Sequence, residues 1–130
     1  GPLGSASGLK MVYAALTKGT AALYASTLMT AKSLDLYEDL IGELEQSQAD
    51  TLTAMNSVKT VSSKAFRWIG EMDEIAATFG DAGTTSKIHE GASETFQQIA
   101  DSSIGHERVD SIDKNRSLED SIAAMLKKAE

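Results

Sequence analysis

The most constraining feature of the sequence is one long stretch, residues 7–32, that is almost without charge. Between Met11 and Ala31 the only charged residue is Lys18, and no proline interrupts the stretch. Alanine, leucine and methionine, which are strong helix formers, recur throughout it. Small or apolar side chains would point in every direction around such a helix, which is typical of a helix that is buried on all sides. We therefore expect a long helix over residues 7–32, wrapped by the rest of the chain or by a second copy.

The same stretch is long enough to cross a membrane, which takes about 20 apolar residues. However, Lys18 and Gly19 lie in its middle, and several serine and threonine residues dilute its apolar character. A lysine at the centre of a membrane-spanning helix costs about 2.5–3.5 kcal/mol on insertion. The sequence therefore favours a buried helix in a soluble protein and no membrane association.

Five shorter helices follow from the spacing of the apolar residues, and no segment of useful length alternates with the period of two that is typical of strands. They are expected at residues 36–46, 51–61, 64–79, 87–102 and 117–128. The helical period is clearest at Trp68, Met72, Ile75 and Phe79. These patterns predict an all-α fold, a helical bundle around the long buried N-terminal helix.

Polar residues at the helix boundaries are the expected caps. Ser7, Asp35, Asp50 and the pair Ser62-Ser63 each precede a predicted helix, and the segment SLED at 117–120 resembles a capping box. Residues 103–116 are polar and weakly patterned, which predicts a loop. Residues 1–5, GPLGS, resemble a protease-cleavage and cloning scar. Residues 6–130 then form a single helical domain.

Charge and composition narrow the possible functions. The net charge of −7 disfavours nucleic-acid binding, which requires a basic face. The chain has no cysteine, which excludes disulfides and thiolate metal sites and fits a reducing compartment such as the cytoplasm. His89 and Glu90 are adjacent and not three or four residues apart, and the only other histidine is His106, so we expect no metal site and place His89 at the surface or rim. No phosphate-binding glycine motif is present.

Lys10 stands out because it lies in the first turns of a helix that otherwise avoids charge. A lysine on a nearly apolar helix either extends its ammonium group to the surface or is held in a cleft for a purpose. A desolvated lysine can exchange protons near neutral pH. From the residues alone we favour the surface position, because Lys10 is near a helix end. Lys18 has the same two interpretations.

Several segments in order, SGLKMVYAALTKGTAALYASTLMTAK, RWIGEMDEIAATF and HEGASETFQQIA, resemble the C-terminal domain of the 3-hydroxyacid dehydrogenase and 6-phosphogluconate dehydrogenase superfamily. The chain most resembles the poorly characterised subgroup labelled as phosphogluconate dehydrogenase C-terminal domains. The resemblance weakens after about Ser102. It implies an N-terminal Rossmann domain, outside this chain, that binds NAD or NADP. It also implies that the helical domain forms homodimers.

The resemblance further implies that Lys10 is the general acid/base at the interdomain cleft. Two positions depart from the family pattern, since Ala6 and Ala14 stand where a glycine and a substrate-binding asparagine are frequent. The lysine–aspartate pair of a later helix is also replaced, near residues 71–72. The resemblance therefore carries over the role of Lys10 but does not identify the substrate.

Three further residues, Tyr13, Thr17 and Lys18, lie on or near the Lys10 face of the helix. They either replace the missing asparagine in substrate binding or serve only in packing.

Two functions follow. The first is the substrate-binding and dimerisation domain of an NAD(P)-dependent oxidoreductase that acts on a hydroxy acid or related small molecule. Such a domain would be catalytically silent without its dinucleotide-binding partner. The alternative is a non-catalytic helical module for homodimerisation or interaction.

Overall fold

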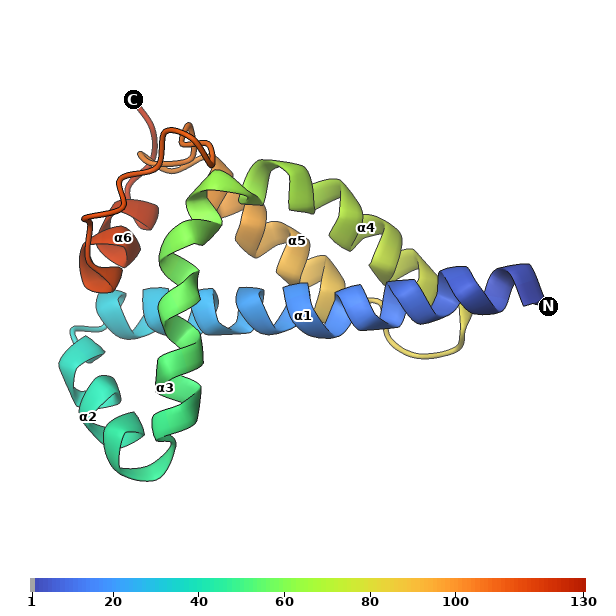
Figure 1. The fold of residues 1–130 in the computed structure, drawn as a ribbon, viewed down its shortest axis with the longest axis horizontal. Coiled ribbons are helices and arrows are strands. Elements are labelled where there is room, and N and C mark those ends of the chain that lie inside the picture. The colour runs from blue at the N-terminus through green and yellow to red at the C-terminus, as the bar shows by residue number, and fades with distance from the viewer. Residues whose placement is uncertain (1) are drawn as a thin grey trace.

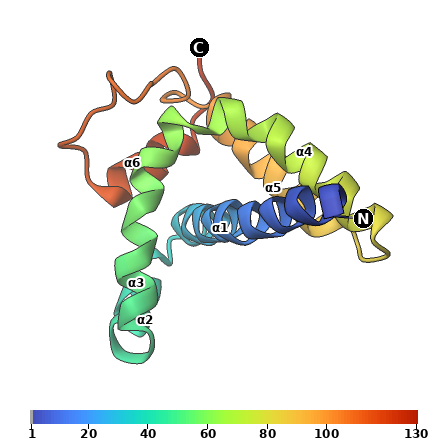
Figure 2. The ribbon, with the colours of Figure 1, turned by 45° about the vertical axis from the view of Figure 1, so that its right-hand side comes forward.

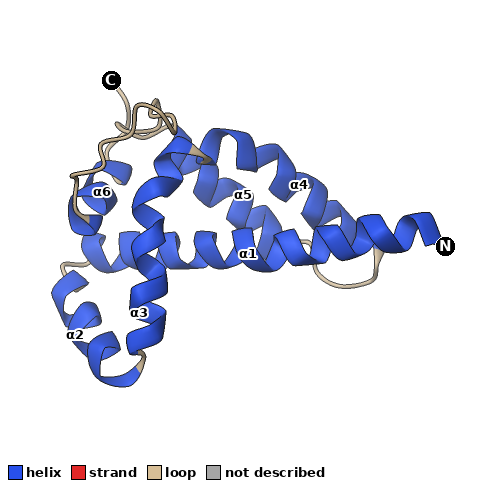
Figure 3. Cartoon of the chain, in the orientation of Figure 1, coloured by secondary structure: helices blue, strands red, loops and turns tan. Residues whose placement is uncertain are grey.

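The computed structural model describes residues 2–130, with side chains from Ala6 onward, and every regular element in that range is a helix (Figures 1 and 3). In chain order these are α1 (Pro2–Ser33), α2 (Tyr37–Ser47), α3 (Ala49–Met55), the 3₁₀ helix η1 (Asn56–Ser63), α4 (Ala65–Asp81), α5 (Lys87–Ala100) and α6 (Leu118–Met125). The predicted all-α bundle is confirmed. Within residues 2–130, no helix is both long enough and apolar enough to cross a membrane.

The other helices are arranged along α1, the longest element (Figure 1). Helices α4 and α5 pack along each other, and both contact α1. Elements η1 and α6 contact α1 as well, and α2 and α3 pack together near its C-terminal end (Figure 1). Figure 2 shows that these elements gather around one side of α1 and leave its N-terminal half without a covering helix on the other side.

One face of α1 is buried in the core, and the opposite face is exposed. The buried face consists of Ala15, Ala22, Ala25, Leu28 and Met29, each less than 5% exposed. The exposed face of the N-terminal half carries the large apolar residues Leu9, Val12, Tyr13, Leu16 and Leu23, which are between 48% and 70% exposed. We call these five residues the α1 stripe. The chain alone therefore does not wrap this helix on all sides, and the second copy stays a prediction.

The third predicted helix, residues 51–61, is split between α3 and the 3₁₀ helix η1. Hydroxyl groups of Ser57, Thr60 and Ser63 each donate to the carbonyl oxygen three residues earlier, at 2.8–2.9 Å. Serine, threonine and valine are weak α-helix formers, and these side-chain bonds compete with the α-helical ladder. A spacing of three residues also places Val58 and Val61 on one face of a 3₁₀ helix, where both are buried.

The predicted caps are mostly wrong, and one is confirmed. Ser7 lies inside α1, which begins at Pro2, a residue that fits the first position of a helix because its missing N–H is not needed there. Asp35 adopts a positive φ of 60° in the turn between α1 and α2, and the α2 N-cap, Leu36, makes no side-chain bond. Asp50 lies in the first turn of α3. Ser117 caps α6 as predicted, accepting from the Asp120 amide at 3.1 Å.

Residues 103–116 form the predicted loop, and a buried ion pair holds it to the bundle. Both guanidinium NH groups of Arg116 donate to the Glu107 carboxylate, at 2.7 and 2.8 Å. Ser62 of η1 donates to the same carboxylate at 2.6 Å, and Arg116 Nε donates to Ser121 of α6 at 2.9 Å. The pair therefore connects the loop to two helices. The buried Ser62 and Ser63 are not N-caps.

The last helix ends at Met125, earlier than the predicted residue 128. Beyond it the chain turns back, and Ser102 and Lys128 form an isolated β-bridge. The amide of Ser103 donates to the Lys127 carbonyl at 2.8 Å, and the amide of Ala129 donates to the Asp101 carbonyl at 3.0 Å. These bonds pair residues 127–129 with residues 101–103, where the prediction had a further helical turn.

Candidate functional site

The first candidate site is the Lys10 face of α1. Lys10, Tyr13 and Thr17 are all exposed and lie three to four residues apart, so they share one side of the helix. The Thr17 hydroxyl donates to the Ala14 carbonyl at 3.2 Å, within its own helix. No residue in the described chain forms an ion pair with Lys10. The helix thus presents these three side chains to solvent, and any cleft around them needs a surface from elsewhere.

Lys18 differs from these three residues because it turns toward α4. Its ammonium group lies 2.7 Å from the Glu71 carboxylate and 5.7 Å from the centroid of the Trp68 ring. Lys64, at the N-terminus of α4, lies 5.9 Å from the same ring. Trp68 packs its edge against Phe96 with centroids 5.3 Å apart. Lys18 therefore already has a carboxylate and an aromatic partner that stabilise it where α1 meets α4.

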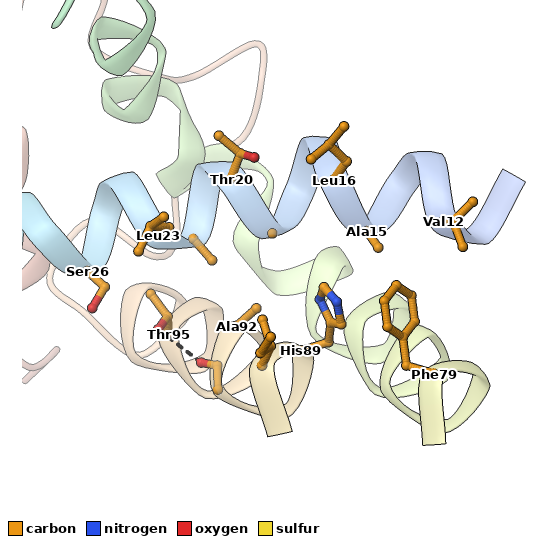
Figure 4. A pocket seen from close by; sticks show the side chains of 14 residues that line it. Val12, Ala15, Leu16, Thr20, Leu23, Ser26, Phe79, His89, Ala92 and Thr95 are labelled. Carbon is orange, nitrogen blue, oxygen red and sulfur yellow. Dashed lines mark hydrogen bonds between the residues drawn. The ribbon is translucent and has the colours of Figure 1, made fainter. Parts of the chain in front are cut away.

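The second candidate site is a groove of about 700 Å³ between α1 and α5, shown in Figure 4. Its floor is made of small residues, Ala15, Gly19 and Ala22 of α1 and Ala92 of α5, and the exposed Gly91 of α5 also lines it. Small side chains on both helices leave space between the backbones. The sequence contains the signal for this groove, because residues 15, 19 and 22 recur at the helical spacing of four and three.

Larger side chains surround this floor (Figure 4). Leu16 and Leu23 of the α1 stripe and Ile88 of α5 form the rim and are 65–70% exposed. Val12 and Phe79 lie at one end, and Ser26 and Thr95 lie at the other (Figure 4). Thr20 completes the lining. The residues that line the groove thus include no aspartate, glutamate, lysine or arginine.

His89 lies in this groove, and its predicted place at the surface or rim is wrong. It is only 6% exposed, and its ring points from α5 toward α1, beside Phe79 (Figure 4). The two rings pack edge to face with centroids 4.4 Å apart. The ring also lies beside Gly19, where a β-carbon would be 3.4 Å from it, an ordinary van der Waals contact. Burial in this apolar setting lowers the pKa of His89.

The Nδ1 atom of His89 is buried and has no hydrogen-bond partner in the described chain. Buried polar atoms are usually paired, so an unpaired one needs an explanation. The sequence indicated neither the burial nor the missing partner, because both depend on where α5 meets α1. Among the described residues no group of three or more potential metal ligands occurs, and His106 is exposed on the loop after α5.

Residues 31–99 match the family model described as a domain of unknown function, DUF1932. This match covers just over half of the chain. The chain belongs to the DUF1932 family. No curated protein sequence and no solved structure matches the chain.

The DUF1932 match extends from the C-terminal end of α1 to the end of α5. It includes His89, Gly91 and the α5 side of the groove. It does not include Lys10, Tyr13, Thr17 or Lys18, which precede the matched residues. Membership of the DUF1932 family therefore gives no information about the role of Lys10.

Proposed function

We propose that this chain is the helical substrate-binding and dimerisation domain of an NAD(P)-dependent oxidoreductase, in which Lys10 is the general acid/base. Two lines of support come from sequence. The DUF1932 family is associated in general with the C-terminal helical domain of 3-hydroxyacid dehydrogenase-like proteins. Several segments of the chain, in the same order, also resemble that domain. The substrate would be a hydroxy acid or a related small molecule.

The observation that carries the proposal is the position of Lys10. It is exposed on the N-terminal half of α1, and the bundle leaves one side of that half uncovered (Figure 2). A second domain placed there would take the ammonium group out of water and complete a cleft around it. The ammonium could then give a proton to a substrate oxygen, and the neutral amine could take one back. Tyr13 and Thr17 would hold the substrate beside it, and Lys18 is less suited because Glu71 already pairs with it.

The described residues offer no place for the cofactor itself. Residues 2–130 contain helices and one isolated bridge, and so no β-α-β unit of the kind that binds a dinucleotide. NAD or NADP, which would supply hydride transfer, therefore belongs to a separate Rossmann domain in this proposal. The helical domain would contribute Lys10 and the contacts to the substrate.

The test is the Lys10→Ala variant in the full-length parent enzyme. Loss of a general acid/base lowers kcat by roughly 10²–10⁴-fold. Binding of the dinucleotide, measured by nicotinamide fluorescence, should stay within a factor of about two, because the proposal assigns Lys10 to the substrate and not to the cofactor. Lys114→Ala, on the exposed loop after α5, is the matched control and should keep its turnover. Near-normal turnover of Lys10→Ala would remove the acid/base role.

A second candidate function, a non-catalytic module for homodimerisation, is favoured by the α1 stripe. Several large apolar side chains lie together on one exposed helix face. Exposed apolar patches of this kind are typical of protein interaction sites. In this case Lys10 and Thr17 would tolerate substitution without any effect beyond stability. Light scattering over a range of concentrations separates the states, and a folded monomer at all concentrations would argue against dimerisation in either proposal.

A further inference from the structure

We propose that the groove between α1 and α5 binds a small, uncharged and mainly apolar molecule that carries one hydrogen-bonding group for the ring of His89. This inference goes beyond the proposed function and does not depend on Lys10, which does not line the groove.

The size and shape of the groove suit a small molecule. Its volume of about 700 Å³ lies within the range of roughly 300–1,000 Å³ that is typical of ligand sites. The floor of alanine and glycine residues is recessed below the exposed rim of Leu16, Leu23 and Ile88. An apolar molecule lying on this floor would cover the exposed apolar side chains of Leu16, Leu23 and Ile88.

The lack of charged residues in the lining favours an uncharged ligand. The protein carries 12 basic and 19 acidic residues, yet none of them lines this groove. Burial lowers the pKa of His89, so its ring is neutral near pH 7. No cation is therefore present for an anionic ligand and no carboxylate for a cationic one. An ionised ligand would lose its hydration without gaining a partner.

His89 supplies the directional contact. Its side chain is more than nine-tenths buried, it points into the space between the two helices, and Nδ1 has no partner (Figure 4). The torsion that turns an imidazole ring is soft, so a modest rotation presents a ring nitrogen to a molecule in the groove. A hydroxyl, amide or carbonyl group on the ligand would then satisfy an atom that the protein leaves unpaired.

A fluorescence titration of the full chain with N-phenyl-1-naphthylamine, an uncharged apolar probe with one N–H group, tests the inference. We expect saturable binding of one probe per chain. The anionic probe 8-anilinonaphthalene-1-sulfonate should bind at least about tenfold more weakly, because no cation lines the groove. Equal binding of the two probes would overturn the assignment of an uncharged ligand.

The matched variants are Gly91→Met and Gly70→Met. A β-carbon at either glycine meets no atom within 4 Å, and both residues are exposed on helices, so both variants should fold. Only Gly91 lines the groove. Gly91→Met should weaken binding of the uncharged probe by at least about tenfold, while Gly70→Met stays within about twofold of the wild type. Unchanged binding in Gly91→Met would overturn the proposal.

A second copy of the chain could cover the same groove, since Leu16 and Leu23 belong both to its rim and to the α1 stripe. Light scattering on the titrated samples separates the two occupants. A wild-type dimer that excludes the probe, together with a monomeric Gly91→Met variant, would show that a second copy fills the groove and would overturn the ligand proposal. Binding of the probe at constant oligomeric state supports the proposal.

Discussion

The buried ion pair between Glu107 and Arg116 should control the stability of this fold, and Glu107→Gln tests it. The two side chains are only 8% and 14% exposed, and the carboxylate accepts two hydrogen bonds from Arg116 and one from Ser62. Glutamine has nearly the same shape but no charge. The variant therefore removes the hydrogen-bonded counter-charge of the buried Arg116 guanidinium and leaves only the weaker attraction of Asp113 and Asp120, while the packing changes little.

Removal of one partner from a buried ion pair costs about 3–5 kcal/mol, because the remaining charge is uncompensated. We expect the lower end, about 3 kcal/mol, since the glutamine oxygen can still accept one hydrogen bond. This is a large fraction of the 5–15 kcal/mol that is typical of a whole domain. For a chain of this length, it corresponds to a fall in Tm of roughly 10 °C.

The measurement is urea unfolding followed by circular dichroism, with Glu71→Gln as the control. The Lys18–Glu71 pair has the same length, 2.7 Å, but its side chains are 24% and 48% exposed. Exposed pairs contribute at most about 1 kcal/mol. If Glu107→Gln costs no more than Glu71→Gln, the assignment of a stabilising buried charge pair is refuted.

The pH dependence gives a second readout. The hydrogen bonds from Arg116 hold the pKa of the Glu107 carboxyl below its usual value. The ionised carboxylate therefore stabilises the folded state. This contribution is complete when the pH is above the pKa of the unfolded chain, about 4.3, and it is lost as the pH falls through the lower pKa of the folded state. The difference in unfolding free energy between wild type and Glu107→Gln should thus stay constant above about pH 5 and narrow in more acidic solution.

Two further predictions concern His89 and Gly105. Burial lowers the pKa of His89, so as the pH drops the unfolded state protonates the imidazole before the folded state does. The free energy of unfolding of the wild type should therefore decrease as the pH drops below about 6.5. His89→Leu should lack this decrease between pH 7 and 5, and parallel curves for the two proteins would contradict the reasoning. A β-carbon on Gly105 would lie 1.9 Å from the Ala100 carbonyl oxygen, so Gly105→Ala should lose about 1–3 kcal/mol of stability. Gly91→Ala, in open space on α5, should instead gain about 0.5–1 kcal/mol, and equal stability of the two alanine variants in thermal unfolding would refute the steric argument.

The helices themselves could be predicted from local pattern. The period of the apolar residues locates α4 and α5 to within two residues at each end, because amphipathic spacing is a property of the segment alone. The cap at Ser117 is predictable for the same reason, since the residue bonds to an amide only three positions away. The 3₁₀ winding of η1 also has a local signal, the spacing of three from Leu52 to Met55, Val58 and Val61, which the prediction of one α-helix over residues 51–61 does not use.

The candidate site could be predicted only in part. Lys10, Tyr13 and Thr17 share the predicted face, because helical spacing decides which side chains are neighbours. The partner of Lys18 was not predictable, because Glu71 is on another helix and 53 positions away. The burial of His89 depends in the same way on packing against other helices, with Gly19 of α1 and Phe79 of α4 beside the ring. Neither contact leaves a periodic trace in the sequence.

The sequence by itself determined that this protein is an all-α bundle around one long helix, because period, helix propensity and the lack of an internal proline act within each segment. Only the tertiary structure decided which face of α1 is covered, where the groove opens, and which charges are buried together. The composition of α1 permits burial on every side, but a helix is buried only where other elements cover it. A single chain covers α1 along one side (Figure 2). The exposed α1 stripe and the uncharged groove beside it are the result.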